Sequence, residues 1–125
     1  MSSRTLTLLT SVGSLRQARR MARLLVEQHL AACVHIAPIE SVYHWQGRLH
    51  REREFQLSMQ TSASRAKALR RTLRTLHPYE LPALYVVTPA WVYAPYARWI
   101  ARSCVPARVP RAARTGAKGA TVVRS

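Results

Sequence analysis

Two segments with helical periodicity, each preceded by a strand-like run, constrain the fold of this chain more than any other feature. Residues 14–30 carry apolar side chains at helical spacing with arginines between them, and residues 63–76 repeat this arrangement. Such an apolar stripe opposite a charged face is typical of a helix that packs on a core. The runs at 5–10 and 50–61 are rich in residues that favour strands. The sequence therefore predicts two strand–helix units in one α+β domain.

The stretch between the two helical segments predicts a long antiparallel hairpin. We expect its first strand at about 33–45 and its second at about 50–61. Gly47 can adopt the positive φ that a tight turn between them requires. Because residues 30–37 are almost continuously apolar, we expect Cys33 to be a buried thiol.

The end of the domain adds a strand and a helix. Residues 84–88 predict the fourth strand, and Pro95 suits the first turn of a last helix. We expect Tyr96, Trp99 and Ile100 of that helix to face inward. The complete order, βαββαβ followed by a helix, predicts a ferredoxin-like sandwich. In such a sandwich the first two helices cover one face of a four-stranded antiparallel sheet.

The chain is strongly basic, since 20 Lys and Arg against 5 Glu and no Asp give a net charge of +15. Residues 105–125 hold five of the basic residues and no acid, and we expect a basic disordered tail there. Residues 1–104 then form the domain, which still carries +10 (15 − 5). Such a field attracts polyanions, so a nucleic-acid-binding module is one candidate function.

Three absences describe the expected setting of the protein. No segment approaches the roughly 18 consecutive apolar residues of a membrane span, so we expect no membrane insertion. The N-terminus shows no signal-peptide pattern. Two cysteines, Cys33 and Cys104, are too few for a disulfide framework. These features favour a cytoplasmic location.

Residues 73–82 end the second helical segment and place an imidazole, a phenol and a carboxylate close together, at His77, Tyr79 and Glu80. The proline after His77 disfavours helical geometry there, so we expect the helix to end at this point. His77 is a good ligand for copper or another divalent cation, and Cys33 is a second candidate. The alternative is that Cys33 packs in the core and His77 forms a structural hydrogen bond, because metal sites normally need three or four ligands.

Catalysis has little support in the sequence, and we expect no enzyme. The chain has no Asp to orient a histidine, and its four scattered glycines form no phosphate loop. Glu52 and Glu54 alternate with arginines, which is typical of a solvated charge ladder. Tyr79 and Glu80, with His77, could instead line a small-molecule pocket at a subunit junction, as in a sensor.

Tyr43 and Trp45 lie near the tip of the expected hairpin. Exposed aromatic side chains there can stack on nucleic-acid bases or pack against another chain. Because the hairpin is longer than a four-stranded sheet requires, we predict a homo-oligomer in which another chain covers it. The basic face of residues 63–76 is either solvated or a weak site for RNA or anionic lipid.

Three motifs occur in a diagnostic order: Leu30-Ala-Ala-Cys33, Tyr43-x-Trp45-x-Gly47 and Leu76-His-Pro-Tyr-Glu80-x-Pro82. Together they resemble the CutA divalent-cation-tolerance family over about residues 5–102. The resemblance implies a ferredoxin-like subunit in a homotrimer similar to PII signalling proteins, with Tyr43 and Trp45 between subunits. It also implies a cytoplasmic role in tolerance of copper and other divalent metals, copper binding in some members, and no established enzymatic activity.

The sequence departs from the pattern of that family in places that concern metal. In copper-binding members a Cys can end the first strand and a His can precede the His-Pro-Tyr motif. Thr10 and Leu76 stand at these positions here, whereas His77 is retained. A common Lys is replaced by Gln60, and a Gly-rich loop is replaced by residues 90–94. The resemblance therefore implies the fold and the trimer more fully than the copper site.

Overall fold

The computed structural model describes residues 4–105, and the elements in this range follow one another in the predicted order. They are β1 (Thr5–Val12), α1 (Leu15–Glu27), β2 (Cys33–Trp45), β3 (Arg48–Ser62), α2 (Ala63–Leu76), β4 (Leu84–Val87) and α3 (Ala94–Ser103). The predicted βαββαβ order with a C-terminal helix is thus confirmed. The basic tail expected at 105–125 lies, from residue 106 on, outside the described residues.

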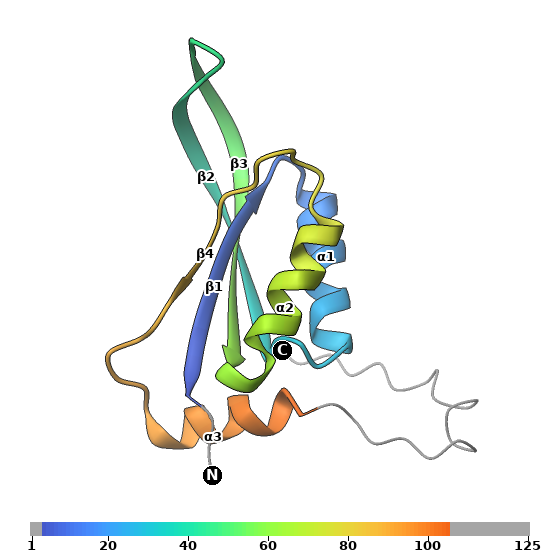
Figure 1. Ribbon diagram of the computed structural model, residues 1–125, viewed down its shortest axis with the longest axis vertical. Coiled ribbons are helices and arrows are strands. Elements are labelled where there is room, and N and C mark those ends of the chain that lie inside the picture. The colour runs from blue at the N-terminus through green and yellow to red at the C-terminus, as the bar shows by residue number, and fades with distance from the viewer. Residues whose placement is uncertain (1–3, 106–125) are drawn as a thin grey trace, which may run out of the picture.

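The strands form one antiparallel sheet in the order β2-β3-β1-β4. β1 lies inside the sheet and pairs with β3 along its whole length, from Thr5↔Ser62 to Val12↔Phe55. Its other edge pairs with the short strand β4. Both α1 and α2 lie on the same side of the sheet, and α3 crosses near the end where β1 begins (Figure 1). Among residues 4–105 no helix lies on the opposite face of the sheet.

The core lies between the sheet and the two helices, because alternate strand residues point toward them. The fully buried apolar side chains of the strands on this face are Leu8, Val12, Leu57 and Met59. The helices contribute the apolar stripes predicted from their periodicity, namely Ala18, Met21, Leu25, Ala66, Leu69 and Leu73. The arginines between these positions remain exposed, as the amphipathic pattern requires.

Helix α1 begins as the sequence predicts but ends earlier. The Ser14 hydroxyl caps it by accepting a hydrogen bond from the Gln17 N–H at 3.2 Å. The prediction that the helix reaches residue 30 is wrong, because His29 takes a left-handed conformation at φ 58°. The His29 N–H donates to the Val26 carbonyl and the Leu30 N–H to the Leu25 carbonyl, which closes the helix in a Schellman motif.

The C-terminal helix is attached to the domain by its last turn. Ile100 and Cys104 are fully buried against Ala32, with Trp99 packed beside them. Pro95 lies in the first turn, as predicted. The prediction that Tyr96 faces inward is wrong, since its side chain is 38% exposed and stacks on Trp99.

The hairpin of β2 and β3 extends well beyond the sheet (Figure 1). Its strands have 13 and 15 residues, whereas β1 has 8 and β4 has 4. The turn between them places both Gln46 and Gly47 at positive φ, 52° and 79°, the signature of a type I′ turn. The prolonged hairpin therefore has only its own two strands to pair with.

Strand β2 forms an edge of the sheet, which corrects the expectation for Cys33. The apolar run at 30–37 led us to expect Cys33 to be buried. Helices cover only one face, however, so Cys33 is half-buried and His35 is exposed. Within a single chain, such an apolar run is buried on both faces only where its strand lies inside the sheet and both faces are covered.

A substitution in the stripe of α2 tests this packing. We expect Leu69→Ala to lower the free energy of unfolding by about 2–5 kcal/mol, because it leaves a cavity in the core. The adjacent, exposed Arg70→Ala should change it by less than about 0.5 kcal/mol. Denaturant unfolding followed by circular dichroism measures both, and equal losses would contradict the assignment of faces.

Candidate functional site

A connecting segment, residues 77–83, leads from the end of α2 across the end of β1 to β4 (Figure 1). It begins at His77, where the proline-imposed end of the helix was predicted and is confirmed. The segment brings His77 and Tyr79 from the helix layer to the edge of the sheet. There they meet residues of β1 and β3.

The centre of this meeting point is Glu54 of β3, which is only 7% exposed. One carboxylate oxygen accepts a hydrogen bond from the Ser41 hydroxyl at 2.6 Å, and the other accepts one from the Tyr79 hydroxyl at 2.7 Å. A buried carboxylate is stable only when it is hydrogen-bonded in this way. The prediction of a solvated ladder is therefore wrong for Glu54.

His77 is held on both sides of its ring. Its Nε2 lies 2.9 Å from the Ser11 carbonyl oxygen, to which it donates, and its Nδ1 accepts from the Tyr79 N–H at 3.1 Å. Together these contacts select the Nε2–H tautomer. The ring also contacts Tyr79 edge to face, with centroids 4.9 Å apart. The structural hydrogen bond at the helix end is thus observed.

Burial shapes the acid–base properties of this cluster. It lowers the pKa of His77 below its ordinary value, and the nearby Ser11 carbonyl and Glu54 carboxylate offset this only in part. Burial, reinforced by the hydrogen bond to Glu54, raises the pKa of Tyr79. The phenol therefore remains a hydrogen-bond donor and the imidazole remains neutral at neutral pH.

Gly13 provides the room in which Tyr79 reaches Glu54. A Cβ atom at Gly13 would lie 3.2 Å from the Tyr79 hydroxyl, closer than an ordinary contact. The hydrogen-bonded cluster of Ser11, Ser41, Glu54, His77 and Tyr79 is called the corner cluster below. It fastens the connecting segment to three strands.

Cys33 lies far from the corner cluster within one chain. Cys33 pairs with Gln60 of β3, whereas Ser11 pairs with Gln56, so they are about 13 Å apart along the strand direction. The Cys33 Sγ lies instead 3.6 Å from the His35 Nε2 on the same face of β2. The structure therefore separates the two predicted metal ligands, and pairs Cys33 with a histidine that we had not proposed.

Thr10, the first-strand position at which the resemblance implied a possible Cys ligand, faces the helices and is buried. Cys33 and His35 lie on the opposite, helix-free face. Within residues 4–105 no three His, Cys, Asp or Glu side chains converge on a point where a metal ion could be held.

The remaining predicted residues lie apart from these groups. Tyr43, on the prolonged hairpin, donates its hydroxyl to Glu52 at 2.8 Å and stacks on His50. The Glu52 carboxylate raises the pKa of Tyr43 through this bond. Trp45 is 37% exposed at the end of β2, and Glu80 is exposed in the connecting segment. Glu80 thus does not contribute to the corner cluster.

Comparison with protein families identifies one match. The model of the CutA1 divalent ion tolerance protein family matches residues 6–103. The divalent-cation tolerance protein CutA of Thermus thermophilus is 36% identical over 93 residues, which cover 74% of this chain and 90% of that protein. The CutA homolog of Xenopus laevis is 38% identical over 84 residues. The chain spans about half the length of the vertebrate curated relatives it matches.

Solved structures give the same answer. CutA from Synechococcus elongatus superposes with a TM-score of 0.80 and is 39% identical, covering 83% of this chain and 93% of its own. CutA from Xylella fastidiosa superposes with a TM-score of 0.79 at 33% identity, covering 82% of this chain and all of its own. The four-stranded sheet and its helices are therefore those of these proteins.

The hydrogen bond between Tyr79 and Glu54 can be tested by removing one oxygen atom. We expect Tyr79→Phe to lower the free energy of unfolding by about 1–3 kcal/mol, because a buried carboxylate oxygen loses its donor. Tyr43→Phe is the matched control, since it removes an exposed phenol–carboxylate bond that water can replace. Chemical denaturation would show little loss in the control, and a similar loss in both would contradict the account.

The lowered pKa of His77 predicts a pH dependence of stability. An unfolded histidine titrates near 6.5, and the folded one titrates lower, so the unfolded state binds more protons between these two values. The free energy of unfolding should therefore be constant above about pH 7 and fall as the pH drops below about 6.5. Unfolding of chelator-treated protein should lose this slope in His77→Gln, and an unchanged slope would refute the assignment.

Proposed function

Because the chain belongs to the CutA family of divalent ion tolerance proteins, we propose that it is a homotrimeric, non-enzymatic protein that binds copper or another divalent cation. The observation that carries this proposal is the family match, which spans nearly the whole described domain. The relatives named above are all called CutA or a CutA homolog, and the one from Thermus thermophilus is called a divalent-cation tolerance protein. None of them carries the name of an enzyme.

The helix-free face of the sheet and the prolonged hairpin support self-association. Tyr85 and Val87 of β4 point to that face and are 52% and 44% exposed. Val42 and Leu49 on one face of the hairpin are also exposed, as is Trp45 on its other face. Apolar side chains gathered on one sheet face and one hairpin are typical of an interface. Two further copies of this chain would cover them in a trimer.

The donors on the helix-free face support metal binding at that interface. A thiolate and an imidazole within 3.6 Å of each other form a pair that suits copper or zinc. One chain supplies two donors there, so a second chain must complete the set. His77 is a further candidate ligand, kept neutral by its lowered pKa, although it would have to release the Ser11 carbonyl.

We also propose that the protein works in the cytoplasm, where its two free cysteines, Cys33 and Cys104, stay reduced. A solved relative from Archaeoglobus fulgidus, 27% identical with a TM-score of 0.78, is described as periplasmic. Among the described residues no helix is both long enough and apolar enough to cross a membrane.

Copper titration by calorimetry tests the metal site. We expect Cys33→Ser, His35→Ala and His77→Ala each to weaken copper binding about tenfold or more, as the loss of a ligand or its support does. His44→Ala, which removes an exposed hairpin histidine, is the control for adventitious binding. Unchanged affinity and stoichiometry in His77→Ala would remove His77 as a ligand. Unchanged binding in all three variants would contradict the metal-binding proposal.

A further inference from the structure

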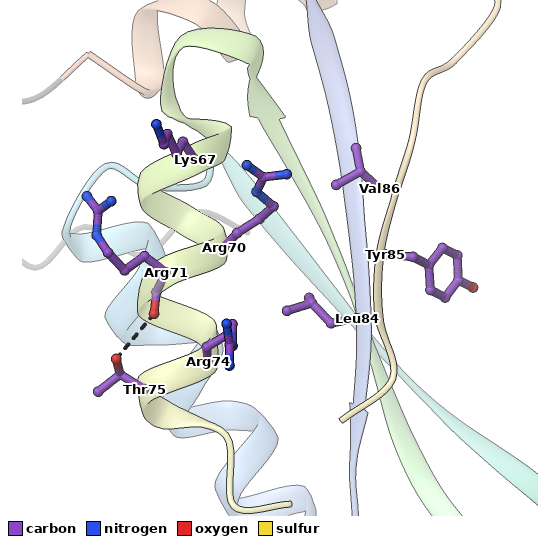
Figure 2. Close-up of a pocket in the computed structure, with 8 residues that line it drawn as sticks. All are labelled: Lys67, Arg70, Arg71, Arg74, Thr75, Leu84, Tyr85 and Val86. Carbon is purple, nitrogen blue, oxygen red and sulfur yellow. Dashed lines mark hydrogen bonds between the residues drawn. The ribbon is translucent and has the colours of Figure 1, made fainter. Parts of the chain in front are cut away.

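Helix α2 and strand β4 enclose an open groove with a volume of about 920 Å³ on the helix side of the sheet. The residues that line it are Lys67, Arg70, Arg71, Arg74, Thr75, Leu84, Tyr85 and Val86 (Figure 2). One wall is formed by the long basic side chains of α2, and the other by β4. The groove is separate from the corner cluster and from the Cys33–His35 pair.

The basic wall is a regular row of charges. Lys67, Arg70, Arg71 and Arg74 follow one another at intervals of three, one and three residues, so they share one face of the helix and span about 10 Å along its axis. All four side chains are exposed. The row therefore presents four positive charges to whatever enters the groove.

No carboxylate in the described part of the chain neutralises this row. The ion pairs among residues 4–105 are Arg23–Glu27 on α1 and Arg51–Glu40 on the hairpin. Glu52 and Glu54 are engaged by tyrosine hydroxyls on the other face. Like charges three and four residues apart destabilise a helix. An anionic ligand would relieve this repulsion, which nothing in the described domain does.

The opposite wall adds apolar surface. Leu84 points from β4 toward α2, whereas the Tyr85 ring turns away from the helix (Figure 2). Val86 is 38% exposed, and β4 is the edge strand of the sheet. A ligand in the groove therefore meets charges on one side and apolar side chains on the other.

We propose that this groove binds single-stranded nucleic acid, with its phosphates along α2 and its bases or sugars against β4. An extended row of four cations in an open groove suits a linear polyanion, because a single phosphate would engage only part of it. Unpaired bases supply the apolar faces that the β4 wall can contact. The positive charge of the whole domain would accelerate the encounter.

The other helix supplies an internal control for this argument. Helix α1 carries a row with the same spacing and the same charge, formed by Arg16, Arg19, Arg20 and Arg23, all exposed. No residue of this row lines the groove. Neutralising either row lowers the net charge of the chain by the same four units. A difference in nucleic-acid binding between the two variants therefore indicates a site in the groove, whereas equal binding indicates attraction by net charge alone.

The experiment uses the full chain and a fluorescently labelled single-stranded RNA of about 12 nucleotides. Fluorescence anisotropy is measured from about 50 to 200 mM salt. The groove variant replaces Lys67, Arg70, Arg71 and Arg74 by Gln, and the control replaces the four arginines of α1 by Gln. We expect the groove variant to bind about tenfold or more weaker than the control. We also expect it to reduce the slope of log K against log salt by up to about 3.

Three results would overturn the proposal. Equal weakening in the two variants would assign binding to net charge alone, and failure of the unaltered chain to bind RNA at low salt would remove the ligand. Sedimentation with phosphatidylserine vesicles that depends on the same four residues, without RNA binding, would assign the groove to a lipid surface. Circular dichroism checks folding, and if the groove variant is unfolded, Arg70→Gln/Arg74→Gln against Arg16→Gln/Arg20→Gln repeats the comparison.

Discussion

The one-sided coverage of the sheet is the constraint on which the rest of the structure depends. Both amphipathic helices pack on one face, where alternate strand residues build the core. No helix of the described part of the chain covers the other face, so the polar and apolar groups there need other partners (Figure 1). The corner cluster and the thiol–imidazole pair satisfy polar groups on that side within the chain, whereas the side chains of β4 there remain exposed.

The corner cluster shows how a buried charge can organise a connection. Glu54 takes both of its hydrogen bonds from residues outside its own strand, Ser41 on β2 and Tyr79 on the connecting segment. The same segment anchors His77 to the carbonyl of Ser11 on β1. These bonds hold the segment that connects α2 to β4, the four-residue strand that pairs with β1. The groove beside α2 follows from that placement.

The periodicity of the apolar residues was enough to predict the helices and strands and their order, because it indicates which side of each helix or strand packs on the core. The turn at Gly47 could also be predicted, since it rests on local chemistry. Three features could not be predicted in this way. The burial of Glu54 depends on Tyr79, 25 positions further along the chain, and Cys33 is half-buried because β2 lies at an edge of the sheet. His29 ends a helix in a conformation that sequences usually signal with glycine.

The proposed metal site also depends on this one-sided coverage. Cys33 and His35 offer two donors on the helix-free face, which another chain would cover. The account therefore depends on association of the chain with itself. Light scattering of the purified protein coupled to size-exclusion chromatography tests this most directly. The account predicts a single species with three times the mass of the chain at low micromolar concentration. A species with the mass of one chain would contradict it.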